Sequence, residues 1–381
     1  MFRYLFTNRF IKISVCLILL ASLAFGAKKA RRFFPAPIPT PKMGGLEVRM
    51  TEADATKAGI QKLNASELNH LNQWLADHPP PLFYGMPVVN SPEELKWVYA
   101  TRNLNNSEQK QDYELSIGAI IQNEADYLKE WIEYHKLLGV QHFWIYNHLS
   151  TDHYLEVLEP YIRSGEVELI EWMVKKYPAC QMTAYEDCIK LATHRTEWLA
   201  LIDVDEFLVP HEHDSMRSFL KDFADSSQIL VNWQIFGTSN IQSLPKGSLL
   251  IEHLTYKFPT QFVSNKWNGN QFVKAIVKPA HVSFPVISSH YYNLLPGYAT
   301  VNGSKKPVTP STTVAEIDVE KIQLNHYWFR TLDFFYDVKI GRRNGVGEKY
   351  PAETVKWLLE MGQAEQDFTI QKFIPKLKED L

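Results

Sequence analysis

The sequence predicts an α/β protein with a mostly parallel sheet that is covered by helices on both faces. Between residues 115 and 205, short apolar segments of the strand type alternate three times with segments of helical spacing. Such alternation is typical of β-α-β units, in which successive strands run parallel and the connecting helices cover the sheet. A second observation is that three carboxylates directly follow the last apolar strand, where sheets of this class place their ligands.

The elements follow one another in a regular order along this region. Leu128, Trp131 and Ile132 share one face of the first helix, and Gly139 marks its end. We expect Pro160 to interrupt the second helix, and Thr183 to open the third with a capping box. The predicted strands are 115–122, 142–147, 167–172 and 198–205, and the predicted helices are 123–139, 154–165 and 182–197.

Composition excludes some classes of protein. The chain has 381 residues and a net charge of −3, so it lacks the basic surplus that a nucleic-acid-binding domain would carry. Its three cysteines form neither a disulfide framework nor a metal-binding spacing.

The N-terminus contains a segment that could engage a membrane. Residues 13–27 are uncharged and mostly apolar, with basic residues on both sides. This length lies between that of a signal peptide and that of a full span, which needs about 17–25 residues. We expect a retained single-pass anchor of open orientation. The alternatives are secretion after cleavage behind Gly26, or a buried helix.

Further boundaries follow from composition. Alternating prolines make 28–45 an extended spacer. Leucines at helical spacing indicate a short helical stem in 46–110. The α/β domain is expected in 111–345, and a helical extension in 346–381.

Asp203 and Asp205 stand at the carboxyl end of the fourth predicted strand. Clustered carboxylates repel each other unless a positive charge lies between them. Two aspartates separated by one residue can both approach a divalent cation, which prefers oxygen ligands. The alternative is a solvated turn between two strands.

Several segments together resemble glycosyltransferase family 92, a family of GT-A type enzymes. They include QNEADYLKEWIEYHKLLGVQHFWIYN, CQMTAYEDCIKLATHRTEWLALIDVDEFL and LNHYW, in the expected order between about 115 and 345. The resemblance implies a GT-A fold. It also implies transfer of a hexose, such as galactose, from a nucleotide-sugar donor, such as a UDP-sugar, to a glycan or other hydroxyl acceptor, with inversion.

The resemblance also assigns roles to residues. Asp203 and Asp205 would hold Mn²⁺ or another divalent cation, and His326 would complete the metal shell. A hydrogen-bonded structural histidine is the alternative for His326, as is a solvated lysine on an edge strand for Lys274. The residues expected to line the donor pocket are Asn123, Glu124, Asn147, Asp152, Gln181 and Lys274.

Inverting transfer needs a base for the acceptor proton. Glu206 adjoins the metal pair and is the candidate, although strand alternation turns it away from Asp205.

Three other interpretations remain open. An inactive carbohydrate-binding protein with the same fold would share most of these motifs. A haloacid-dehalogenase-like phosphotransferase needs Thr or Val where Phe207 stands, and its motif lies on the first strand. His211 and His213 form a zinc pair only if a third ligand joins them.

Overall fold

A computed structural model describes residues 112–172, 179–261, 269–341 and 350–381. The expected anchor, spacer and stem, residues 1–110, lie outside these ranges. Within them, no helix is both long and apolar enough to cross a membrane.

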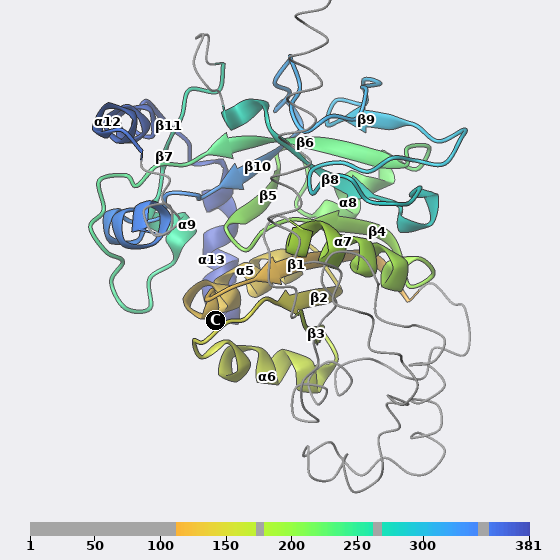
Figure 1. The fold of residues 1–381 in the computed structure, drawn as a ribbon, viewed down its shortest axis with the longest axis horizontal. Helices are drawn as coiled ribbons and strands as arrows, with labels where there is room; N and C mark the ends of the chain where they lie inside the picture. The colour runs from red at the N-terminus through yellow and green to blue at the C-terminus, as the bar shows by residue number, and fades with distance from the viewer. Residues whose placement is uncertain (1–111, 173–178, 262–268, 342–349) are drawn as a thin grey trace, which may run out of the picture. The chain divides into compact units, whose positions relative to one another are not determined.

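One half of the main sheet consists of parallel strands in the order β3-β2-β1-β4 (Figure 1). Most of their buried positions are apolar or aromatic, as expected for strands covered on both faces. The buried polar positions are Ser116, His142, Asn147, Glu168, Glu171 and Thr196. The bounds are β1 Tyr113–Ile121, β2 His142–Asn147, β3 Val167–Glu171 and β4 Thr196–Leu201.

The other half continues the sheet with mixed directions, in the order β8-β6-β10-β5. Strand β8 runs antiparallel to both β4 and β6, whereas β10 is parallel to β6 and antiparallel to β5. A short strand, β9, pairs in parallel with β6. The bounds are β5 Glu206–Pro210, β6 Gln228–Ile235, β8 Val273–Val277, β9 Thr300–Asn302 and β10 Ile322–His326.

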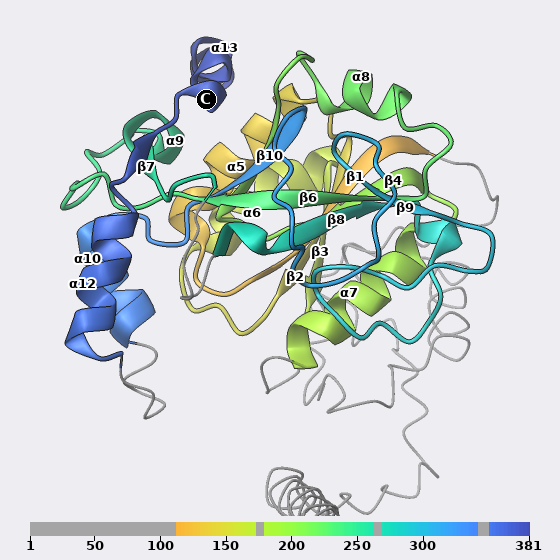
Figure 2. The same ribbon diagram turned by 90° about the horizontal axis from the view of Figure 1, so that it is seen from above.

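Helices cover both faces of this sheet, which confirms the predicted α/β class. Helices α5, α6 and α8 pack into one hydrophobic core, and α7 packs into a second core on the opposite face (Figure 2). The bounds are α5 Ala125–Leu137, α6 Tyr154–Ser164, α7 Ala179–Ala192 and α8 Met216–Lys221.

The C-terminal residues pack against the α/β domain. Strand β11 pairs with β7, and Phe373 and Leu377 enter the first core. A Cβ on Gly237 would collide with the carbonyl oxygen of Gly362, so the two backbone segments cross in direct contact. The remaining elements are β7 Tyr256–Lys257, β11 Glu365–Gln366, α9 Leu250–His253, α10 Leu332–Phe334, a π-helix at Phe335–Ile340, α12 Ala352–Met361, α13 Ile374–Asp380, and 3₁₀ turns at Gly269–Gln271, Pro279–His281 and Thr369–Phe373.

Two local expectations were wrong. Helix α6 continues through Pro160, because the carbonyl that loses its partner, at Glu156, lies on the exposed side where water can satisfy it. Helix α7 already includes Ala179, so Thr183 lies inside it. The Thr183 hydroxyl donates to the Cys180 carbonyl at 3.2 Å instead of capping the helix.

Candidate active site at the carboxyl edge of the sheet

The strand directions bring distant parts of the chain to one edge of the sheet. Strands β1 to β4 end at this edge, and β8, antiparallel to β4, begins there. Strands β6 and β10 also end there, and β5 begins there, with Glu206 paired to His326. The loops after the strands of an open α/β sheet are its usual ligand site.

Strand β4 ends at Leu201, four residues before the predicted end, and β5 begins at Glu206. Asp203 and Asp205 therefore lie in the turn that connects the two strands, which we call the acidic turn. Asp203 faces helix α7: its Oδ1 accepts from Gln181 Nε2 at 2.8 Å and from the Tyr185 hydroxyl at 3.0 Å. Its Oδ2 accepts from Lys274 Nζ at 3.1 Å. Gln181 and Lys274 therefore contact the turn, and their binding of a donor stays a prediction.

Asp205 is 7% exposed and lies between a lysine and a histidine. Its Oδ2 accepts from Lys339 Nζ at 3.1 Å, and its Oδ1 lies 3.4 Å from His326 Nε2. Burial alone would raise the pKa of Asp205, but Lys339, His326 and Arg330 outweigh burial and hold this pKa well below its usual value. The turn is therefore not a solvated one.

Glu206 is fully buried. Its Oε2 accepts from the Asp203 backbone N–H at 2.8 Å and lies 3.7 Å from Lys274 Nζ, while its Oε1 has no hydrogen-bond partner in the described ranges. Burial, together with the charges of Asp203 and Asp205, raises the pKa of Glu206 well above its usual value despite Lys274. The base role of Glu206 stays a prediction, and its lack of accessible surface weighs against direct contact with an acceptor.

Lys274 is 2% exposed on β8, an interior strand, so the alternative of a solvated edge lysine does not hold. Burial would lower the pKa of Lys274, but Asp203 and Glu206 raise it. Lys274 therefore places a positive charge next to the carboxyl groups of both Asp203 and Glu206.

Asn123, Asn147 and Asp152 tie together the loops after β1 and β2. Asn123, at φ +57°, accepts from the Thr151 N–H at 2.7 Å, and Asp152 Oδ2 accepts from the Ala125 N–H at 2.8 Å. Asn147 donates to Glu171 Oε2 at 2.7 Å. The hydrogen bonds of these residues therefore hold the loops in place. Their contact with a donor stays a prediction. Asp152 Oδ1 has no partner among the described residues.

Glu124 pairs with Arg330, a residue that the sequence analysis missed. Arg330 is fully buried, and its guanidinium lies 3.8 Å from the ring centroid of Tyr127 and 4.4 Å from that of Phe334. Within the described chain, its Nε and Nη1 have no hydrogen-bond partner. Burial raises the pKa of Glu124, and the charge of Arg330 opposes this effect.

Lys339 was missed as well. The available signal was the need for charge balance: a cluster of acids beside a core must be matched by cations, and basic residues recur after His326. Sequence alone does not show which of them reaches the site.

An aromatic group borders Asp205. The ring centroid of Trp233 lies 4.3 Å from that of His326, 5.1 Å from that of Phe272 and 5.4 Å from that of His290. Trp233 Nε1 and His326 Nδ1 are buried and have no hydrogen-bond partner among the described residues. The His326 ring is thus held by a tilted contact with the Trp233 ring, with Nε2 toward Asp205.

The described residues contain no group of three or more His, Cys, Asp or Glu side chains that could hold a metal. The chemistry of the donor set nevertheless fits a divalent cation at Asp205 and His326, which present a carboxylate oxygen and an imidazole nitrogen to each other. Asp203 is turned toward α7 and Lys274. The three-residue metal set therefore stays a prediction.

The zinc alternative finds no support. His211 uses one ring nitrogen on the Glu320 carbonyl at 3.0 Å and the other on Gln323 Oε1 at 3.1 Å. His213 Nε2 lies 3.3 Å from Asp222 Oδ2, so this nitrogen of His213 faces a carboxylate.

A mostly parallel α/β sheet with buried acids and cations gathered after its central strand is the arrangement expected for a ligand-binding α/β enzyme. The chain belongs to glycosyltransferase family 92, whose sequence profile matches residues 112–344.

Curated relatives come from plants. A family 92 protein of Ricinus communis is 26% identical over 254 residues, which cover 62% of this chain and 39% of the relative. One from Oryza sativa subsp. japonica is 25% identical over 262 residues, covering 68% and 39%. The chain thus spans about two fifths of the length of these relatives. Among solved structures, Staphylococcus aureus TarS (residues 1–349) shows 15% identity and a TM-score of 0.28, covering 45% of this chain and 50% of TarS. A likeness this distant adds nothing about ligands.

Proposed function

We propose that the protein is a metal-dependent glycosyltransferase that moves a hexose, such as galactose, from a nucleotide-sugar donor, such as a UDP-sugar, to a glycan hydroxyl with inversion. One observation carries the proposal: Asp205 faces His326 in the turn after the central strand, at the ligand edge of the sheet, with buried cations around it. Membership of family 92 supports the reaction class.

Asp205 Oδ1 and His326 Nε2 would hold the cation, and Asp203 lies two residues away in the same turn. When bound, a divalent cation stabilises the negative charge that develops on a departing diphosphate. Lys339 contacts Asp205 Oδ2, so its ammonium group must move before a ligand can reach that oxygen.

The protein's own cations suit the same leaving group. Lys274, Lys339 and Arg330 surround the acidic turn and keep the site near neutrality. In an inverting transfer, the acceptor oxygen bonds to the anomeric carbon while the bond from that carbon to the diphosphate oxygen breaks. The acceptor proton passes to a base, for which Glu206 remains the candidate.

The test is a donor screen with purified protein. Transfer or hydrolysis of a nucleotide-sugar should stop with EDTA and return with Mn²⁺, and Asp205→Asn should abolish it. Full activity without metal would overturn the metal dependence. Saccharide binding without turnover of any donor would favour the inactive carbohydrate-binding alternative. Transfer of phosphate would favour the phosphotransferase.

Membrane attachment through residues 13–27 is a separate proposal. It is supported by the uncharged apolar run and by the proline spacer that follows. The full-length protein should resist carbonate extraction, while a chain beginning at Lys42 should be soluble and active. A mature chain that begins at Ala27 would show cleavage instead. Loss of activity on removing residues 1–41 would show that the proposed boundary is wrong.

A further inference from the structure

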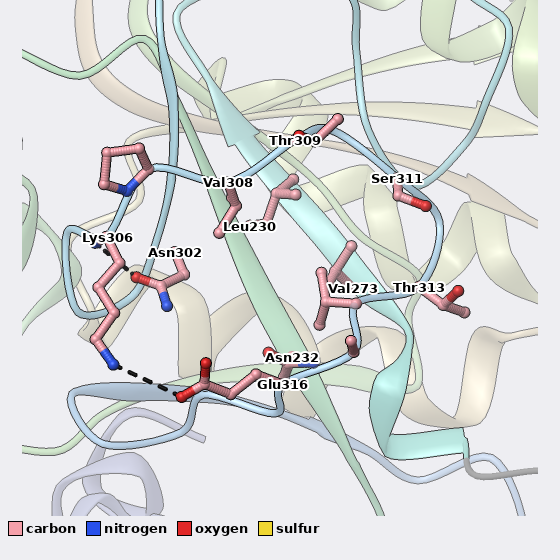
Figure 3. Close-up of a pocket in the computed structure, with 13 residues that line it drawn as sticks. Leu230, Asn232, Val273, Asn302, Lys306, Val308, Thr309, Ser311, Thr313 and Glu316 are labelled. Atoms are coloured by element: carbon pink, nitrogen blue, oxygen red, sulfur yellow. Dashed lines mark hydrogen bonds and ion pairs between the residues drawn. The ribbon is translucent and has the colours of Figure 1, made fainter.

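A cavity of about 400 Å³ lies on the second half of the sheet (Figure 3). Leu230 of β6 and Val273 of β8 contribute its apolar lining, and the loop that follows β9 supplies most of the rest. The volume falls within the range of small-molecule sites, about 300–1,000 Å³.

The loop side of the cavity is rich in uncommitted hydroxyl groups. Thr309, Ser311 and Thr313 line it, and none of their side chains hydrogen-bonds to any residue that the structure describes. Asn302 uses its Oδ1 to accept from the Ser304 and Lys306 N–H groups, at 3.2 and 2.8 Å, which leaves its amide nitrogen available.

The charges at this cavity cancel. Lys306 and Glu316 are exposed and lie 3.7 Å apart, as an ion pair at its border (Figure 3). Asn232, which also lines the cavity, is satisfied by the Asn270 carbonyl and the Asp318 N–H. Hydroxyl and amide groups without net charge, beside an apolar floor, match a neutral polyhydroxylated ligand better than a phosphate.

The cavity lies near the carboxyl edge of the sheet. Two of its lining residues, Val273 and Asn232, pair with each other where β8 begins and β6 approaches its end. The lining loop is fixed to the start of β8, because the Val273 N–H donates to the Thr312 carbonyl and the Val314 N–H donates to the Gln271 carbonyl. A ligand here would therefore lie beside the carboxyl edge.

We infer that this cavity binds the saccharide that receives the transferred hexose. This inference rests on the proposed function and adds the location and the neutral chemistry of the acceptor. In this arrangement, the side chains of the loop 309–313 determine which acceptor saccharide binds, while the donor binds at the acidic turn.

The test compares two changes with a matched control. Ser311→Ala combined with Thr313→Ala removes two hydroxyls, and Thr313→Trp fills the space. Thr312→Ala alters the same loop at a residue that does not line the cavity. Each lost hydrogen bond corresponds to a several-fold loss of affinity, so the double variant should raise the acceptor KM roughly tenfold. Its donor KM and its donor hydrolysis without acceptor should match those of the control.

Binding is measured separately by saturation-transfer NMR with lactose, cellobiose and maltose as probes. A signal that Thr313→Trp removes and Thr312→Ala retains supports the inference. Unchanged acceptor KM and unchanged NMR signal in both cavity variants would overturn it. If the unaltered protein turns over no donor, the proposed function fails, and the NMR comparison still decides whether the cavity binds saccharides.

Discussion

Asp205→Asn should destabilise the metal-free protein. The substitution keeps the size of the side chain but removes a buried charge that faces Lys339 at 3.1 Å and His326 at 3.4 Å. Breaking a fully buried pair costs about 3–5 kcal/mol. Lys339 is 17% exposed and can regain some water, so we expect about 2 kcal/mol. For a chain of 381 residues, that loss lowers Tm by roughly 2–3 °C.

This expected loss in the free energy of unfolding has the opposite sign to the gain that would follow if neutralising one of three clustered acids mainly relieved their repulsion. Because the pKa of Asp205 is held well below 3.8 in the folded state, its contribution is fully present above that pH. The difference from the unaltered protein should therefore stay constant between pH 5 and 8, and shrink only as pH falls through the folded-state pKa.

The assay is urea unfolding in EDTA, with Asp225→Asn as the control because Asp225 is exposed and forms no ion pair among the described residues. A double-mutant cycle with Lys339→Met isolates the coupling between the two side chains. A free energy of unfolding equal to or above that of the unaltered protein would show that repulsion dominates and refute this reasoning.

Three further outcomes are expected. His326→Ala should raise the Mn²⁺ concentration for half-maximal activity roughly tenfold, since one ligand is lost; a normal metal titration in the folded fraction would make His326 structural. Burial raises the pKa of Glu130 to about 7, so stability relative to Glu130→Gln should fall by up to about 3 kcal/mol as pH rises from 5 to 8; a pH-independent difference in urea midpoints would contradict this. Gly237→Ala should lower the free energy of unfolding by about 2–3 kcal/mol, because the new Cβ meets the Gly362 carbonyl. The Cβ of the control, Gly341→Ala, meets nothing closer than 3.6 Å, so this variant should lose less stability. Equal urea midpoints for the two variants would refute the backbone crossing.

The sequence predicted local structure where the pattern was continuous. Strand β2 begins and ends at the predicted residues, His142 and Asn147, because this run is buried throughout and has no polar break. The end of β4 was placed too late, since Ile202 and Val204 are apolar but belong to the turn. Apolar character alone does not separate a strand from a buried turn.

The site was predictable only in its acidic half. Asp203 and Asp205 follow a recognisable strand, so their place at the carboxyl edge followed from fold class. Arg330 and Lys339 reach Glu124 and Asp205 across 206 and 134 residues, through β10, whose pairing with β5 and β6 is not encoded in any local pattern. Long-range strand order therefore decides which cations meet the acids.

The order of synthesis gives this arrangement a consequence for the nascent chain. A ribosome adds Asp205 134 residues before Lys339, and it adds β10 only after the other strands of the main sheet. Domains fold as their sequence emerges, so the acidic turn must wait in water while the first four strands assemble. A chain stalled before Ile322 would expose the edges of β5 and β6 that β10 covers. Lys274 would already be present for Asp203, but Glu124 and Asp205 would lack Arg330 and Lys339. Insertion of β10 between β5 and β6 joins the two strands and is followed by the cations that pair with Glu124 and Asp205, so this edge of the sheet is completed only after β10 has been synthesised.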